Sequence, residues 1–186
     1  MILLARHGET EWNAIGRLQG HTDVELNPTG RAQARALAGS LAGARIVEVR
    51  TSDLARARET GAIVAAELGL APPSVDADLR ERRFGVFEGL TRDECASRYP
   101  DAWHAWTSRT EHPPGGESRA DAIARMARAI ARVHTDARGA TLVVSHGGVM
   151  RLWLTELLGT NIPLVGNGVV YDVAHDGTAF RAALRS

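Results

Sequence analysis

Short runs of apolar residues recur along the chain and predict buried β-strands. Residues 2–5, 46–50 and 141–145 form three such runs, rich in Ile, Leu and Val. Continuous apolar runs are typical of strands that are covered on both faces, as in a parallel sheet. Two further β-like stretches, residues 169–173 and 178–184, follow in the C-terminal part.

Apolar residues spaced at i, i+3, i+4 and i+7 predict helices between these strands. Asn27 followed by Pro28 is typical of a helix start, with the asparagine as N-cap and the proline at the first helical position. Ser52 and Ser118 are predicted to cap two further helices, and a fourth helix is predicted after Ser145. The side chains expected to face the core are Ala34, Leu37, Ala38 and Leu41 in the first helix, Ala57, Gly61, Val64 and Leu68 in the second, Ile123, Met126, Ala127, Ile130 and Val133 in the third, and Val149, Leu152 and Trp153 in the fourth.

Strands that alternate with helices predict an α/β fold, here a three-layer sandwich with a mostly parallel central sheet and helices on both faces. The length of 186 residues suits a single domain, residues 1–186. Residues 82–116 are the least regular part, and we expect them to form an excursion that covers the substrate. In such folds, ligands bind beyond the carboxyl ends of the strands.

The charge and composition exclude several classes of function. The 22 basic and 22 acidic residues cancel, so no nucleic acid or membrane partner is expected. Every basic residue is arginine, which excludes the lysine-containing P-loop of nucleotide hydrolases. One cysteine, Cys95, cannot form an intramolecular disulfide framework. No apolar run approaches the roughly 20 residues of a membrane span, and the N-terminal run is too short for a signal peptide. We therefore predict a cytoplasmic protein.

Two histidines stand directly after predicted strands, and glycine follows each of them. His7 precedes Gly8, and His146 precedes Gly147. A lone histidine at a strand end is usually structural, but two at one edge of a sheet favour a shared site. Glycine would allow the backbone to approach a ligand closely. The helix after His146 would favour an anion at its N-terminus.

Arg56 is predicted in the first turn of the second helix. A cation there opposes the helix dipole, at a cost of roughly 0.3–1 kcal/mol. Arg56 either tolerates this cost in solvent, as we expect for Arg58, or faces a bound phosphate, and the sequence leaves both interpretations open. The seven histidines show no spacing typical of zinc sites, so we expect neither a metal nor another cofactor.

Five blocks of sequence resemble, in order, the motifs of the histidine phosphatase superfamily, which includes the cofactor-dependent phosphoglycerate mutases. They are LARHGETEWN at residues 4–13, LNPTGRAQA at 26–34, TSDLARA at 51–57, LRERRFGVFEG at 79–89 and VSHGG at 144–148. A single Arg-His-Gly triplet would be a weak signal, whereas five ordered blocks are a specific one.

The resemblance implies a role for each matching residue and a phosphatase acting on a small phosphorylated metabolite. His7 would be the nucleophile that forms a phosphohistidine. Arg6, Arg56 and His146 would bind the phosphoryl oxygens. Glu81 would protonate the leaving oxygen and then activate the attacking water. Further residues expected to border the phosphate pocket are Asn13, Gln19, Gly20 and Gly147.

The residue types suit this chemistry independently of the resemblance. Imidazole is largely neutral near pH 7 and attacks phosphorus without a strong base, provided that its other ring nitrogen is held, as by a backbone carbonyl. For Glu81 the demand is greater, because half protonation of a glutamic acid at pH 7 costs about 3.7 kcal/mol. Nearby arginines oppose protonation, whereas desolvation and the substrate dianion favour it. We therefore expect an acidic pH optimum, or protonation mainly in the substrate complex.

Two alternatives compete with the phosphatase. A phosphoglycerate mutase needs a second anion site, but residues 99–112 contain only Arg109 and no arginine pair. Whether Arg82, Arg83 or Arg109 forms such a site is left open. A non-catalytic phosphate-binding module would be expected to lack His7 or Glu81. The phosphatase is therefore favoured.

Two further features are left open. Trp103 and Trp106, with His104 between them, either form a lid over the alcohol part of the substrate or anchor a short helix to the core. The oligomeric state is also open, with a homodimer as the candidate because exposed edges of such sandwiches commonly pair.

Overall fold

The computed structural model describes residues 1–136 and 138–185. The strands are β1 (Ile2–Arg6), β2 (Ile46–Thr51), β3 (Ser74–Val75), β4 (Ala140–Ser145), β5 (Val170–His175) and β6 (Phe180–Leu184). The α-helices are α1 (Glu11–Ala14), α2 (Pro28–Leu41), α3 (Ala55–Glu67), α4 (Arg92–Arg98), α5 (Pro100–Thr107), α6 (Arg119–Asp136) and α7 (Gly147–Leu158), and short 3-10 helices cover Ala42–Ala44, Ala77–Leu79 and Gly85–Phe87. Among these helices, none has the length and apolar character needed to cross a membrane.

The strands form one mixed sheet in the order β3-β2-β4-β1-β5-β6. The first four strands are parallel to their neighbours, whereas β5 runs antiparallel to β1 and pairs with β6 in a hairpin. The predicted α/β fold with a mostly parallel sheet is therefore confirmed. The antiparallel hairpin was not predicted, although the two β-like stretches that form it were.

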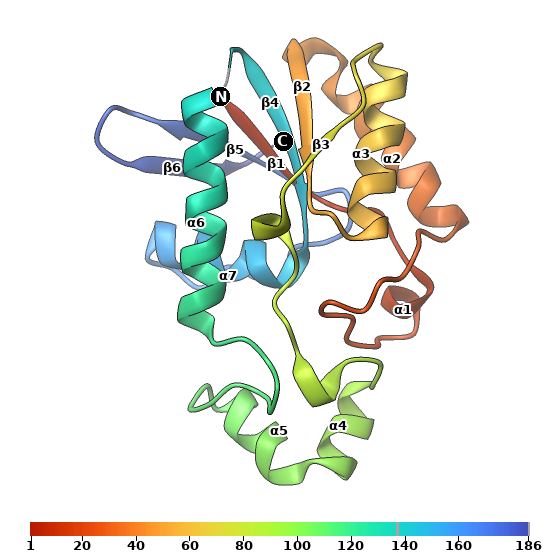
Figure 1. Cartoon of the computed structure of the whole chain (residues 1–186), viewed down its shortest axis with the longest axis vertical. Coiled ribbons are helices and arrows are strands. Elements are labelled where there is room, and N and C mark those ends of the chain that lie inside the picture. Colours follow the sequence, from red (N-terminus) through yellow and green to blue (C-terminus); the bar gives the residue numbers. More distant parts are fainter. Residues whose placement is uncertain (137, 186) are drawn as a thin grey trace.

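The central strand β1 shows why the sheet is covered on both faces. Ile2 and Leu4 belong to a core cluster shared with α6 and α7, and Leu3 and Ala5 belong to a second cluster shared with α2 and α3. Because successive side chains of a strand point to opposite faces, an uninterrupted apolar run supplies both cores. Figure 1 shows the two helix pairs on opposite sides of the sheet, as the three-layer prediction requires.

The helix starts agree with the sequence at Asn27 and at Ser118, whose Oγ accepts from the Asp121 N–H at 3.0 Å, and differ at Ser52. The side chain of Asn27 accepts a hydrogen bond from the Gly30 N–H at 2.8 Å, so α2 has the predicted N-cap. The prediction that Ser52 caps the next helix is wrong, because α3 begins three residues later. Its first N–H, on Ala55, is bound instead by the carboxylate of Asp23 at 2.6 Å. A side chain from a distant loop has thus replaced the local cap.

Residues 82–116 lie outside the sandwich, in the lower part of Figure 1, and carry α4 and α5. The helix α5 packs against buried Phe87, whose ring centroid lies 5.6 Å from those of both Trp103 and Trp106. The two tryptophans therefore anchor a short helix, which favours the second of the two interpretations. His104 is exposed. The proposed cover over the substrate stays a prediction.

The loop after β1 packs so closely on α2 that Gly30 has no room for a side chain. A Cβ at Gly30 would collide with the backbone of Glu9, whereas a Cβ at Gly39 of the same helix would meet no atom within 4 Å. We expect Gly30→Ala to lower the free energy of unfolding by about 1–3 kcal/mol, since backbone must shift. Gly39→Ala should raise it by about 0.5–1 kcal/mol. Urea denaturation of both variants checks this, and equal effects would contradict the packing described.

Candidate active site

The two histidines meet because their strands are parallel neighbours. Arg6 at the end of β1 pairs in register with Ser145 at the end of β4, and the His7 N–H donates to the Ser145 carbonyl at 3.0 Å. His7 and His146 follow directly, and their ring centroids lie 5.0 Å apart. Two residues that are distant in sequence therefore form one site at the carboxyl edge of the sheet.

Hydrogen bonds to the Nδ1 atoms fix how both rings are protonated. Nδ1 of His7 lies 2.6 Å from the carbonyl oxygen of Gly8, so it carries the hydrogen and leaves the lone pair on Nε2. Nδ1 of His146 instead accepts from Nε of Arg56 at 3.2 Å, so Nε2 of His146 carries its hydrogen. Burial, followed by the charge of Arg56, holds the pKa of both rings well below 6.5. One ring can therefore act as a nucleophile and the other as a hydrogen-bond donor.

Arg56 is buried rather than solvated, which excludes the solvated interpretation of its position in the first turn of α3, while its contact with a phosphate stays a prediction. Its side chain is 1% exposed, and its guanidinium donates to the carbonyls of Gly20 at 2.8 Å and Thr22 at 3.0 Å. Burial lowers its pKa to about 10, so it stays charged at neutral pH. The neighbouring Arg58 is exposed, as expected.

These groups open into a pocket of about 280 Å³ whose lining includes His7 and Glu81. Three buried polar atoms of the site residues have no hydrogen-bond partner among the described residues: Nε of Arg6 and Oε1 of Gln19, which line the pocket, and Nε2 of His146, whose ring lies against that of His7. Buried polar groups normally have partners, so such atoms indicate a ligand or water. Nε of Arg6 and Nε2 of His146 are hydrogen-bond donors, and the arginine is positively charged, so the missing partner is best supplied by an anion.

Glu81 occupies the N-terminus of α7. Its carboxylate accepts the N–H groups of Arg82 at 2.7 Å, Val149 at 2.7 Å and Gly148 at 2.9 Å. A Cβ at Gly148 would lie 2.6 Å from Oε1 of Glu81, so glycine is needed for this approach. The N–H groups of Gly148 and Val149 at this helix end therefore bind the protein's own carboxylate, whereas Gly147 lines the pocket, and its contact with a ligand stays a prediction.

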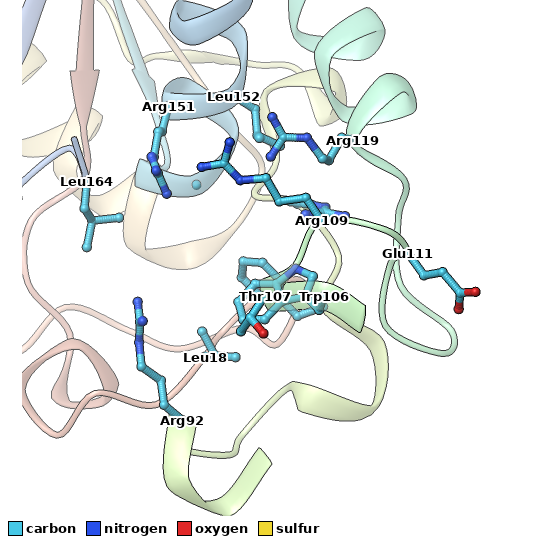
Figure 2. A pocket seen from close by; sticks show the side chains of 13 residues that line it. Leu18, Arg92, Trp106, Thr107, Arg109, Glu111, Arg119, Arg151, Leu152 and Leu164 are labelled. Atoms are coloured by element: carbon cyan, nitrogen blue, oxygen red, sulfur yellow. The ribbon is translucent and has the colours of Figure 1, made fainter. Parts of the chain in front are cut away.

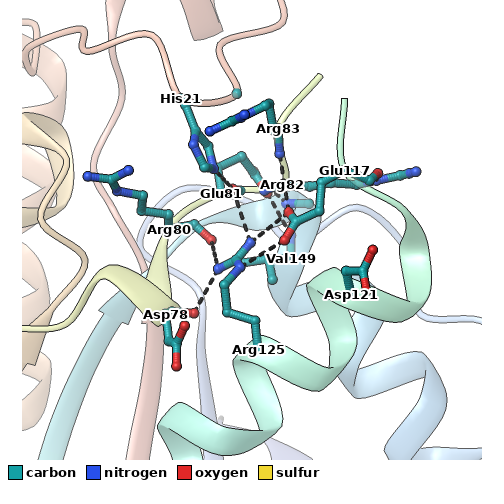
Figure 3. Close-up of polar contacts among 12 residues, drawn as sticks. His21, Asp78, Arg80, Glu81, Arg82, Arg83, Glu117, Asp121, Arg125 and Val149 are labelled. Carbon is teal, nitrogen blue, oxygen red and sulfur yellow. Dashed lines mark hydrogen bonds and ion pairs between the residues drawn. The ribbon is translucent and has the colours of Figure 1, made fainter. Parts of the chain in front are cut away.

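The loop that carries Glu81 is held from behind by Arg125 of α6, as Figure 3 shows. Its guanidinium donates to the carbonyls of Asp78 at 2.7 Å, Arg80 at 2.8 Å and Glu81 at 3.3 Å. The carboxylate of Glu117 binds the same guanidinium at 2.8 Å. The sequence alone did not indicate Arg125, because the three carbonyl groups that it binds lie more than 40 residues away.

All nine predicted site residues line the pocket or border it directly. Asn167 was missed, and its side-chain amide donates to the His7 carbonyl at 2.9 Å. Of the arginines left open, Arg82 and Arg109 line an adjoining pocket, whereas Arg83 lines a separate hollow with His21. The predicted residues in the pocket lining are Arg6, His7, Asn13, Gln19, Gly20, Arg56, Glu81 and Gly147, and His146 lies buried against Arg56.

The fold and the site define an α/β protein that presents a neutral imidazole and two arginines to a small anion. The chain matches the model of the histidine phosphatase superfamily (branch 1) over residues 2–179, and it belongs to this family. Two Arabidopsis thaliana relatives, phosphoglycerate mutase-like protein 4 and a metal-independent phosphoserine phosphatase, are 43% and 42% identical, each over 81% of this chain. The matches cover 67% and 65% of these relatives, so the chain spans roughly two thirds of their length.

A solved structure supports the same assignment. A mycobacterial glucosyl-3-phosphoglycerate phosphatase, determined in complex with VO3, superposes with a TM-score of 0.85 at 30% sequence identity. The match covers 98% of this chain and 96% of that structure's chain. The similarity therefore includes residues 82–116 as well as the sandwich.

The buried neutral histidines predict how stability depends on pH. Because the folded pKa values of His7 and His146 lie below 6.5, the unfolded chain binds more protons below that pH. The free energy of unfolding should therefore fall as the pH drops from 6.5, by up to about 1.4 kcal/mol per pH unit for each ring. Urea denaturation of wild type and His146→Gln should show a shallower slope in the variant. An exposed control, His104→Gln, should keep the wild-type slope, and a variant slope equal to wild type would contradict the assignment.

Proposed function

We propose that this chain is a metal-independent phosphatase that hydrolyses small phosphomonoesters through a phosphohistidine on His7. The observation that carries the proposal is the paired ring geometry. The Gly8 carbonyl holds Nδ1–H of His7 and leaves the Nε2 lone pair free, while His146 offers an N–H beside it. Family membership and the phosphatases among the relatives support the same activity.

In the first step, Nε2 of His7 forms a bond to phosphorus as the ester P–O bond breaks. Phosphoryl transfer needs mainly positioning and neutralisation of the equatorial oxygens. Nε of Arg6, the guanidinium of Arg56 and Nε2–H of His146 would supply these contacts. The arginines would attract the phosphoryl group. Because His7 is neutral before the reaction, its Nε2 can attack phosphorus without first losing a proton.

Glu81 would give a proton to the leaving alcohol oxygen and then take one from the attacking water. Water attack breaks the N–P bond, releases inorganic phosphate and restores His7. Two backbone N–H groups bind Oε1 of Glu81, but only Gly148 binds Oε2, so Oε2 has a lone pair free for a proton. The substrate phosphate, with a second pKa of about 6, can bring that proton into the site.

The covalent intermediate gives the sharpest test. Wild type should hydrolyse p-nitrophenyl phosphate in the presence of EDTA, and a rapid quench should trap acid-labile phosphate on the protein. His7→Gln should lose the trapped phosphate and at least about 1000-fold in kcat, since the nucleophile is gone. His104→Gln is the matched control, because His104 is exposed and should change neither readout. Loss of activity in the presence of EDTA, or phosphate trapped on the His7→Gln variant, would contradict the proposal.

The mutase remains the second candidate, supported by the mutase-like relative. It shares the first step and differs in the acceptor of the phosphoryl group. Incubation with 3-phosphoglycerate and 2,3-bisphosphoglycerate separates the two, because a phosphatase releases inorganic phosphate and a mutase yields the isomer. A non-catalytic module would give neither product.

The proposed partner of the chain is a small phosphorylated metabolite. The cytoplasmic location and the homodimer stay predictions.

Arg125 is predicted to act by positioning Glu81. We expect Arg125→Met to slow the first turnover of an alkyl phosphate by about 10- to 100-fold, because the acid is displaced. First-turnover release of p-nitrophenol should change far less, since that leaving group needs no protonation. Arg125→Lys should restore part of the rate.

The control is Arg128→Met on the same helix, where the side chain is 60% exposed. This variant should keep the wild-type first-turnover rate with both substrates. An equal loss for both leaving groups in Arg125→Met would indicate a merely structural role.

A further inference from the structure

The sequence block LNPTGRAQA, residues 26–34, takes no part in the chemistry proposed above. In the structure it starts α2 and packs on the loop that carries the nucleophile. A Cβ at Gly8 would collide with the Gly30 carbonyl, so the two backbones touch. Asn27 binds Glu9 twice, because its N–H donates to the Glu9 carbonyl at 3.0 Å and its side-chain amide to the Glu9 carboxylate at 2.8 Å. The start of α2 therefore contacts the residues that directly follow His7.

Gln33 connects this helix to the nucleophile. It follows Gly30 by three residues, so both lie on the same face of α2. Its Oε1 accepts the Glu9 N–H at 2.8 Å. That N–H belongs to the same peptide group as the Gly8 carbonyl, which accepts Nδ1–H of His7 at 2.6 Å. One chain of hydrogen bonds therefore runs from the imidazole, through the Gly8–Glu9 peptide, to the side chain of Gln33.

The preceding peptide group, between His7 and Gly8, is held by two further side chains. Its carbonyl accepts from the amide of Asn167 at 2.9 Å, and its N–H donates to Oγ1 of Thr60 at 3.0 Å. Thr60 is buried, and its hydroxyl donates to the Arg56 carbonyl at 2.7 Å, so a lone pair of the oxygen is left for the Gly8 N–H. Backbone groups that have left the sheet need such partners. The Gly8 carbonyl is therefore held toward the ring of His7.

The hydrogen bond from the Glu9 N–H to Gln33 strengthens the bond that the Gly8 carbonyl makes to His7, because hydrogen bonds in a chain polarise one another. This matters most when the ring is positively charged, since charge-assisted hydrogen bonds are roughly twice as strong as neutral ones. In the proposed reaction, Nε2 bonds to phosphorus while Nδ1 keeps its hydrogen, so the ring becomes a cation. Burial lowers the pKa of His7 and opposes this charge, whereas the bond to Gly8 raises the pKa.

We infer that Gln33 is a positioning residue for the nucleophile: through the Gly8–Glu9 peptide, it holds and polarises the carbonyl that stabilises the His7 cation during phosphoryl transfer. This inference rests on the proposed phosphatase function. A carboxylate has a similar role behind the histidine of Ser-His-Asp triads, where it contacts the ring directly. Among the described residues, Gln33 lines neither the phosphoryl pocket nor the adjoining pocket that Figure 2 shows, so it acts without touching the substrate.

A series of variants at position 33 tests the inference by the rate of the first turnover. Release of p-nitrophenol in that turnover reports attack by His7, because this leaving group needs no proton from Glu81. Gln33→Met removes the acceptor at similar size and should slow the saturating rate by about tenfold, as for the loss of one hydrogen bond. The half-saturating substrate concentration should stay within about twofold. Gln33→Glu keeps an acceptor oxygen and, being ionised at pH 7, should restore the rate to wild type or above.

Nuclear magnetic resonance gives a readout that does not depend on turnover. In protein labelled with 15N-histidine, the Nδ1–H proton of His7 is identified by its absence in His7→Gln. Its resonance moves downfield as its hydrogen bond strengthens. We expect an upfield shift in Gln33→Met and a resonance at or downfield of wild type in Gln33→Glu. A merely structural role for Gln33 would not order both the resonance and the rate by the strength of the acceptor.

Two control variants lie on exposed positions of the same helix. Arg35→Met repeats the change to methionine two residues away, and Ala36→Gly weakens α2 without touching the loop. Both should keep the wild-type rate and resonance.

The outcomes separate this inference from the phosphatase itself. An unchanged rate or resonance in Gln33→Met, an equal loss in Ala36→Gly, or a Gln33→Glu variant as slow as Gln33→Met overturns the role of Gln33 and leaves the phosphatase standing. If wild type does not hydrolyse p-nitrophenyl phosphate, the phosphatase fails. The resonances of the three proteins then still test the chain of hydrogen bonds, with the same order expected.

Discussion

The parallel pairing of β1 with β4 is the constraint on which the rest of the site depends. Because Arg6 and Ser145 are in register, the residues that follow them leave the sheet at the same point, and the two imidazoles meet. A slip of one residue would turn the side chains of either strand to the opposite face. The alternate packing of the β1 side chains into two cores prevents such a slip. The hydrophobic layers therefore set the chemical geometry.

The electrostatics of the site follow from the hydrogen-bond partners of its charged side chains, which are mostly neutral groups. Arg56 is charged and buried, yet its hydrogen bonds go to carbonyl oxygens and to His146 rather than to a carboxylate. Glu81, in turn, is bound mainly by backbone N–H groups. Among the residues that the structure describes, no carboxylate thus forms an ion pair with Arg6 or Arg56 near His7. A dianionic group would supply that partner, which is how the proposed site, with two neutral histidines, would attract phosphate.

Much of this arrangement could be predicted from local sequence. Apolar runs indicated the strands, Asn27-Pro28 indicated a helix start, and ordered motifs brought His7, Glu81 and Arg56 together as candidates. Contacts made across long sequence distances could not be predicted in this way. Asp23 caps α3 in place of Ser52, and Asn167 reaches the His7 carbonyl without any pattern that would mark it.

The division between the sandwich and residues 82–116 has a consequence for how such an enzyme changes. The aromatic contact of Phe87 with Trp103 and Trp106 lets α5 pack as a unit, and Arg109 follows it directly. Of the described residues that line the pocket around His7, only Phe84 and Arg92 belong to this segment. Exchanging this one segment for another of similar length would alter the far wall of the cavity and spare the reactive imidazole. Ligand choice and bond-breaking can thus diverge separately within a single chain.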